Sequence, residues 1–508
     1  MMETEGTEIV ENYQVVSDGI SADVKILRIP SKFTMSYKIT TPVIDQSMNA
    51  VLTEIRTQLI REDPSKIQQL SQTTSEALKR EFLEIVQKKL QEIIPGMQEK
   101  SYLELSATLL HEMFGLGIIE ILDMDPNLEE IVINDSKTQV MVYHIKYGWL
   151  ETNVRIETES KIESYAQQIA RKVGRQITNL NPLLDAQLPN GDRVNATLYP
   201  ISTHGNTLDI RKFRAEPWTI IDFLKRKTVS KELVSFVWQA MQYELSFLVT
   251  GGTAAGKTSM LNVFLPFIPP NQRIITIEDT SELVLPKYMH WVPMLTRQPN
   301  SEGKGQVTML DLLLNSLRMR PDRLVVGEIR RKEDAQTLFE AMMTGHSVYA
   351  TMHAETAQQV VKRLISEPID LPEIEVSTLD LIITSFRQRR TGVRRVLELA
   401  EIVERQVSGE MELKTNNLFE WKPRTDTIER TINTSQKIST KLALYSGLTS
   451  EEMAADLKEK ETVLQWMVEK GINNVNVIGL AASNYYTNHD KLMQLINDKG
   501  DPSALESL

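Results

Sequence analysis

The chain has 508 residues, of which 41% are hydrophobic and 25% are charged, and these values are ordinary for a globular protein. Its net charge of −11 argues against a dedicated nucleic-acid-binding protein, because no overall basic field is present to displace counterions from phosphates. The absence of cysteine excludes disulfide bonds, thiolate chemistry and Cys-ligated zinc.

The sequence also indicates where in the cell the protein is expected. No run approaches the ~18 consecutive apolar residues that a membrane span needs, and no signal peptide is predicted. We therefore expect a cytoplasmic protein, with at most a peripheral association with the cytoplasmic membrane.

The first two predicted segments are an accessory region over residues 1–100 and an α+β domain over residues 101–215. In the accessory region, alternating apolar residues predict short strands over 24–29 and 34–39. An apolar stripe at three- and four-residue steps then predicts a small helical bundle that ends near Pro95. The second segment combines sheet strands, a helix and a turn, as its alternating pattern indicates.

Three further segments follow. A linker is predicted over residues 216–229, where Pro217 and a basic run interrupt the pattern. From 230 to 430, short apolar strands alternate with helices, which is typical of a parallel sheet covered by helices. Residues 431–508 are predicted to be helical, with a capping box at Thr449 and Glu452.

Residues 251–258, GGTAAGKT, form a complete G-x-x-x-x-G-K-[ST] phosphate-binding loop between a predicted strand and a predicted helix. Its glycines let successive backbone N–H groups turn toward one anion, and the helix N-terminus adds partial positive charge. We expect Lys257 to neutralise the β- and γ-phosphates and Thr258 to bind Mg²⁺. The expected nucleotide-binding residues are Gly251, Gly252, Thr253, Ala254, Ala255, Gly256, Lys257, Thr258 and Ser259.

Carboxylates follow two further predicted strands. The strand that starts at Arg273 ends in Glu278, Asp279 and Glu282, and the strand that starts at Arg323 reaches Glu328. Because the carboxyl ends of strands line the ligand crevice of an open α/β sheet, we expect these side chains near the γ-phosphate. One of them can act as general base on water, and Glu328 can also hold Mg²⁺ through water.

Two of the seven histidines, His346 and His353, flank a third apolar strand. Since that strand is expected to end at the same crevice, we predict that at least one of them senses the γ-phosphate. A metal site at these histidines is disfavoured, because the chain has no cysteine and no further histidine is near in the sequence.

In this order, the blocks GGTAAGKT, ITIEDTSEL, RMRPDRLVVGEIR and TGHSVYATMHAET resemble the Walker A, Asp-box, Walker B and His-box motifs of the secretion ATPase superfamily. That superfamily serves type II and type IV secretion and type IV pilus machines, and the resemblance covers residues 100–430. Segments such as LFEWKPRTDTIE are similar to archaeal members, including archaellum motor and archaeal pilus ATPases. The resemblance implies an α/β fold with a RecA-like P-loop NTPase core and helical accessory regions at both ends.

The resemblance also implies roles for single residues. Lys257 and Thr258 bind phosphate and Mg²⁺, Glu328 matches the Walker B glutamate and His353 matches the His-box histidine. Glu282 resembles the Asp-box glutamate that activates water, so both Glu282 and Glu328 stay open as the base. Two arginines of the α+β domain match those that reach the nucleotide as charge-neutralising fingers, namely Arg193 and Arg211.

The leading functional hypothesis is a homohexameric ATPase that uses ATP and Mg²⁺ and drives an archaeal filament through a polytopic membrane platform protein. The alternative is a nucleic-acid translocase with the same core, supported by the basic segment 387–395. That segment is predicted to be a hairpin tip whose exposed arginines are solvated, and anionic lipid would suit them as well as DNA. We expect no nucleic acid. A third hypothesis is a nucleotide-gated scaffold that does not hydrolyse ATP.

Overall fold

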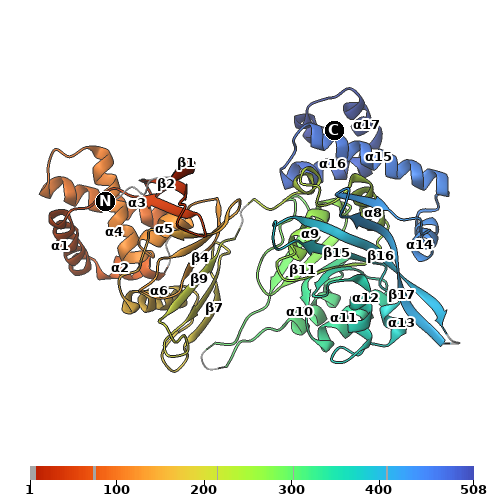
Figure 1. The fold of residues 1–508 in the computed structure, drawn as a ribbon, viewed down its shortest axis with the longest axis horizontal. Coiled ribbons are helices and arrows are strands. Elements are labelled where there is room, and N and C mark those ends of the chain that lie inside the picture. Colours follow the sequence, from red (N-terminus) through yellow and green to blue (C-terminus); the bar gives the residue numbers. More distant parts are fainter. Residues whose placement is uncertain (1–6, 73–75, 214–215, 301–302, 408–409, 508) are drawn as a thin grey trace. The chain divides into compact units, whose positions relative to one another are not determined.

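The computed structural model describes residues 7–72, 76–213, 216–300, 303–407 and 410–507 (Figure 1). They fall into two compact units, one that ends at residue 213 and one that begins at residue 216. Among these residues, no helix is both long and apolar enough to cross a membrane.

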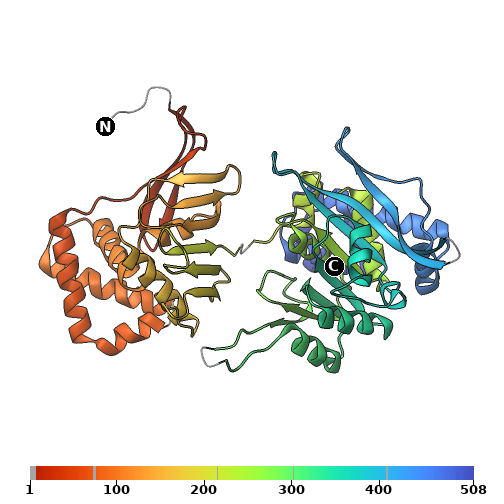
Figure 2. The ribbon, with the colours of Figure 1, turned by 60° about the horizontal axis from the view of Figure 1, so that its bottom comes forward.

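The first unit is a nine-stranded sheet with helices, in the strand order β1-β2-β3-β6-β5-β4-β9-β8-β7. Helices α4, α5 and α6 pack against its strands, and α1 to α4 enclose a second apolar cluster of their own (Figures 1 and 2). Its elements are β1 Glu8–Ser17, β2 Ile20–Arg28, β3 Ser36–Thr40, α1 Gln46–Glu62, α2 Pro64–Gln72, α3 Glu76–Ile93, α4 Glu99–Phe114, α5 Ile118–Asp123, β4 Leu128–Ile133, β5 Met141–His144, β6 Gly148–Thr152, α6 Glu159–Lys172, β7 Leu183–Gln187, β8 Arg193–Thr197 and β9 Thr207–Arg211.

The strands near the N-terminus do not stand apart from the α+β segment. β3 pairs in parallel with β6, and this pairing joins β1 to β3 to the rest of the sheet. Val24, Ile26 and Tyr37 are fully buried in the same apolar core as Ile131 and Val142. The first 100 residues therefore contribute strands to a shared sheet, because one face of those strands is apolar and needs a common core.

The second unit is also built on a nine-stranded sheet, in the order β12-β11-β13-β14-β10-β15-β16-β17-β18. Its elements are α7 Ile220–Lys225, α8 Lys231–Gln242, β10 Phe247–Gly251, α9 Lys257–Phe264, β11 Arg273–Glu278, β12 His290–Leu295, α10 Met309–Ser316, β13 Arg323–Ile329, α11 Lys332–Met343, β14 Ser347–Met352, α12 Ala357–Ile365, α13 Glu373–Val376, β15 Leu381–Arg387, β16 Arg394–Val407, β17 Glu410–Lys422, β18 Thr427–Arg430, α14 Lys437–Ser446, α15 Ser450–Glu469, α16 Val475–Thr487 and α17 His489–Asn497, with short 3-10 turns at Leu265–Phe267, Leu317–Met319 and Pro502–Ser507.

Six strands of this sheet, from β12 to β15, are parallel, and β16 to β18 extend it in antiparallel fashion. β10 lies at the centre and carries the phosphate-binding loop at its carboxyl end. The strand after the next one in the sheet, β13, ends at Glu328 and Ile329. This is the RecA-like P-loop arrangement, and the predicted α/β fold class is confirmed.

The segment 216–229 is not a plain linker, because it contains helix α7. Ile220 and Ile221 of that helix are buried in the core of the second unit. The four helices that follow β18 pack on the same core, where Trp238 of α8 stacks on Phe267 with ring centroids 4.5 Å apart. The capping box at Thr449 and Glu452 is confirmed at the start of α15.

Glu401, a fully buried carboxyl on β16, fastens the start of α14 to the sheet. Its oxygens accept the backbone N–H groups of Gln436 at 2.7 Å, Lys437 at 3.1 Å and Ile438 at 2.9 Å. The N-cap residue of α14, Gln436, makes no side-chain cap of its own. Glu401 therefore satisfies donors that the helix start would otherwise bury without partners.

We expect Glu401→Ala to lower the free energy of unfolding by about 3 kcal/mol, because several buried N–H donors lose a charged acceptor together. Thermal unfolding of the full chain measures the effect. Glu401→Gln keeps one acceptor oxygen and should lose less. Equal stability of Glu401→Ala and wild type would show that water replaces the carboxyl without cost.

Candidate active site

The phosphate-binding loop leaves β10 at Gly251 and enters α9 at Lys257. A Cβ at Gly251 would lie 2.4 Å from the carbonyl oxygen of Ser385, so only glycine fits there. Gly256 caps α9 in the left-handed region at φ 86°, which glycine adopts without strain. The turn thus presents the N-terminus of α9, with its partial positive charge, to an anion.

Lys257 faces the carboxyl of Glu328, with Nζ and Oε1 3.9 Å apart. Burial lowers the pKa of Lys257, while Glu328 acts to raise it and Arg330 acts to lower it. The site therefore places a lysine amine and a carboxyl group together beside the loop. These are the groups that phosphate and a positioned water require.

Glu328 also pairs with Arg330, whose Nη2 lies 2.6 Å from its Oε2. The same guanidinium reaches Asp279 after β11, with Nη1 3.0 Å from Oδ2. Arg330 therefore bridges the carboxylates that end two different strands. Arg330 was not predicted from the sequence, although its place two residues after Glu328 is a signal.

Glu278, the last residue of β11, is more buried than Asp279 and Glu282, which follow the strand. Its Oε1 accepts the backbone N–H groups of Glu282 at 2.9 Å and Leu283 at 3.1 Å. Burial raises the pKa of Glu278 to about 7, against the effect of those two donors. Glu278 thus shapes the turn that carries Glu282, and Glu282 lies close enough to act on the pKa of Lys257.

The two histidines have separate environments. Nε2 of His353 lies 3.2 Å from Oγ1 of Thr253 in the phosphate-binding loop. His346 instead contacts the carbonyl oxygen of Ala341 through Nδ1 at 3.2 Å, at the end of α11. Of the pair, His353 is therefore the one placed beside the loop.

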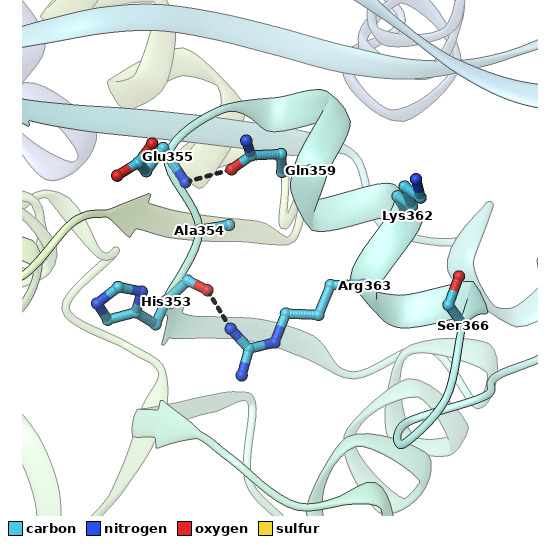
Figure 3. Close-up of a pocket in the computed structure, with 7 residues that line it drawn as sticks. All are labelled: His353, Ala354, Glu355, Gln359, Lys362, Arg363 and Ser366. Atoms are coloured by element: carbon cyan, nitrogen blue, oxygen red, sulfur yellow. Dashed lines mark hydrogen bonds between the residues drawn. The ribbon is translucent and has the colours of Figure 1, made fainter.

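A cleft of about 480 Å³ lies beside His353, between the end of β14 and helix α12 (Figure 3). Nη1 of Arg363 donates to the carbonyl oxygen of His353 at 2.6 Å and fixes the backbone that carries the imidazole. The cleft is lined by His353, Ala354, Glu355, Gln359, Lys362, Arg363 and Ser366. None of them belongs to the phosphate-binding loop, so the cleft adjoins the site and is not its phosphate cradle.

The two arginines predicted to reach the nucleotide, Arg193 and Arg211, are neighbours in the first unit. Arg193 on β8 and Arg211 on β9 are direct partners in the register of these antiparallel strands. Nε of Arg211 lies 3.9 Å from Oε1 of Glu130, which comes from β4. The structure thus brings the two guanidinium groups to one edge of one sheet, and their contact with a nucleotide stays a prediction.

The basic segment 387–395 forms a hairpin as predicted, but its arginines do not make one exposed patch. Arg395 is only 8% exposed and forms two 2.8 Å hydrogen bonds with Asp426. This contact holds the pKa of Asp426 at about 2. Arg394 points the other way, because successive side chains of a strand alternate, and its Nε lies 3.4 Å from the carbonyl oxygen of Ala254 in the phosphate-binding loop. The expectation of solvated arginines is wrong for Arg395.

The raised pKa of Glu278 makes a stability prediction with a definite sign. A carboxyl whose pKa is higher in the folded state stabilises the fold below its ordinary pKa of 4.5, and this contribution is lost as the pH rises to about 7. We expect Glu278→Gln to show a smaller fall in melting temperature than wild type between those pH values. Glu404→Gln, an exposed carboxyl on β16, controls for the lost charge. Parallel pH profiles for Glu278→Gln and wild type would contradict the assignment.

Comparisons with known proteins identify the family of this chain. The model of the family described as "Type II/IV secretion system protein" matches residues 114–435, more than half of the chain. The chain is 33% identical over 371 residues to the uncharacterized protein MJ0900 of Methanocaldococcus jannaschii, a match that covers 72% of this chain and 66% of that relative. It is 29% identical over 303 residues to the type IV secretion system protein PtlH of Bordetella pertussis, covering 53% of this chain and 88% of PtlH.

Among solved structures, the pilus retraction motor PilT with bound ADP is similar over 77% of this chain and 99% of that chain, with 18% identity and a TM-score of 0.41. The family assignment depends on the sequence match, which extends from α4 of the first unit through the whole RecA-like sheet of the second. The protein belongs to the type II/IV secretion system protein family.

Proposed function

We propose that this chain is the ATP-hydrolysing motor of an archaeal type IV pilus-like filament, an archaellum or a pilus. It acts as a homohexamer on the cytoplasmic side of the membrane and works through a polytopic membrane platform protein. Membership of the family supports ATP hydrolysis in general. MJ0900 and a second similar protein both come from the archaeon Methanocaldococcus jannaschii, and this origin favours the archaeal filament among the machines of this family.

The observation that carries the catalytic part is the opposition of Lys257 and Glu328 across the loop that starts α9. Lys257 with the helix N-terminus neutralises phosphate oxygens, and Glu328 orients or deprotonates the attacking water. The residue types fit magnesium, because Thr258 follows Lys257 in the first turn of α9 and Glu328, 3.9 Å from Lys257, supplies carboxylate oxygens. Bound magnesium would neutralise charge that develops on the transferred phosphoryl group.

Glu282 is the second candidate for the base. It follows Glu278 by four residues in the turn that Glu278 fixes. Glu328 is the stronger candidate, because its carboxyl is held by both Lys257 and Arg330. A carboxylate with a fixed orientation is the better partner for a water that must attack in line.

The coupling of hydrolysis to motion is the second part of the proposal. Arg193 and Arg211 belong to the first unit, and Lys257 belongs to the second. Guanidinium groups that approach the phosphates only when the two units close on ATP would couple the chemistry to a movement between units. We propose that this movement exerts force on the platform protein.

A nucleic-acid translocase is the second candidate function. The basic segment 387–395 supported this function. Because Arg395 of that segment is buried against Asp426, its charge is not available to bind nucleic acid. Turnover measured with anionic lipid vesicles and with DNA separates the two functions. We expect lipid to stimulate hydrolysis and DNA to have no effect; the reverse result would favour the translocase.

The first catalytic prediction concerns Glu328. Glu328→Gln should keep ATP binding and lower turnover by about 10²-fold, the scale of one lost acid–base group. Lys257→Ala should abolish hydrolysis and weaken binding, because the phosphates lose their cation. Steady-state ATPase and calorimetric binding measure both, and Glu282→Gln in parallel decides between the two carboxylates. Loss of binding in Glu328→Gln would make Glu328 a metal or structural residue, and normal turnover in Lys257→Ala would disprove the site.

The second prediction concerns the arginines. The Arg193→Ala/Arg211→Ala double variant should lose about 10³-fold in turnover, and each single variant less, because the remaining guanidinium compensates in part. Arg171→Ala, an exposed arginine on α6, is the matched control and should not change turnover. Sedimentation reports whether the ring still assembles. Normal hydrolysis by the double variant would contradict the mechanism of movement between units.

A further inference from the structure

Arg394 lies against the phosphate-binding loop, where the proposed function gave it no role. Its Nε is 3.4 Å from the carbonyl oxygen of Ala254, at the long end of a hydrogen bond. Its Cδ lies 3.7 Å from the position that a Cβ would take at Gly256. The side chain therefore covers the turn from which α9 starts.

The positions at which the neighbouring strands end explain why Arg394 lies against the loop. β10 ends at Gly251, which pairs with Ser385 of β15, and β15 continues for two more residues to Arg387. Arg394 is the partner of Arg387 at the start of β16. The first residue of β16 thus stands beyond the edge of the central strands, at the height of the loop and not of the sheet.

Arg395 holds this strand end in place. Its guanidinium donates to both carboxyl oxygens of Asp426 at 2.8 Å and to the carbonyl oxygen of Arg226 at 3.1 Å. Since neighbouring side chains of a strand point to opposite faces, the buried fork of Arg395 fixes the backbone from which Arg394 projects toward the loop. Arg394 is therefore exposed at its head and fixed at its base.

The strand order gives the direction of a bound nucleotide. Glu328 lies near the end of β13 and His353 follows β14, both on one side of β10, and Arg394 begins β16, on the other side. A triphosphate whose γ-phosphate lies toward Glu328 and His353 directs its opposite end toward Arg394. That end carries the nucleoside.

We infer that Arg394 is a nucleotide-binding residue whose guanidinium contacts the base of the bound nucleotide. A planar guanidinium stacks on aromatic rings and donates hydrogen bonds in its own plane, and both suit a purine. This inference depends on the proposed function, because it assumes that ATP occupies the loop with its γ-phosphate beside Glu328. It adds an anchor for the nucleoside to a site otherwise built for phosphate.

Calorimetric titration of the full chain with ATP, ADP and inorganic triphosphate tests the inference. Arg394→Ala should raise the Kd for ATP and for ADP by about tenfold each, the scale of one desolvated guanidinium–ring contact. The Kd for inorganic triphosphate, which has no base, should stay at the wild-type value. An equal loss for all three ligands would overturn the inference, because Arg394 would then only brace the loop through Ala254.

Two variants sharpen the test. Arg390→Ala removes the same charge from the exposed tip of the same hairpin and should leave all three Kd values unchanged. Arg394→Lys keeps the charge without the planar fork and should restore only part of the affinity; full restoration would contradict a contact with the ring. Thermal unfolding confirms that each variant is folded. If wild type itself fails to bind ATP, the proposed function fails; if wild type binds and Arg394→Ala binds equally well, only this inference fails.

Discussion

The site depends on one constraint, which is that parallel strands end at the same edge of a sheet. β10, β11, β13 and β14 are parallel neighbours, so the residues that follow them meet although they are up to 100 positions apart in the chain. The contact of Thr253 with His353 and that of Lys257 with Glu328 are both consequences of this geometry. Without the shared edge, each motif would be an isolated polar loop.

Ion pairs and hydrogen bonds then hold the side chains that the sheet brings together. Arg330 ties Glu328 to Asp279, and Arg363 fixes the backbone of His353. Such contacts limit the positions that the Glu328 carboxyl and the His353 backbone can adopt. The buried carboxyl of Glu278 fixes the neighbouring turn, because it accepts the backbone N–H groups of Glu282 and Leu283.

The C-terminal helices and the hairpin of β15 and β16 belong to the same physical unit as the loop. Glu401 in the middle of β16 fastens α14, and Arg394 at the start of β16 lies 3.4 Å from the carbonyl oxygen of Ala254. One strand therefore links the phosphate-binding loop to the helical layer. Two charged residues of this strand, Arg394 and Glu401, make these contacts.

The sequence by itself determined the phosphate-binding loop and the strand and helix that flank it, because these depend on local spacing and on strand–loop–helix order. It also gave Lys257 and Glu328 as candidate site residues. It did not determine that strands near the N-terminus join the sheet of the first unit, since β3 and β6 are more than 100 residues apart. Only the tertiary structure separated Arg394 from Arg395, placing one on the loop and burying the other against Asp426. The reason is physical: a run of arginines has one composition, but the alternation of a strand and the partners on each of its faces give neighbouring residues opposite environments.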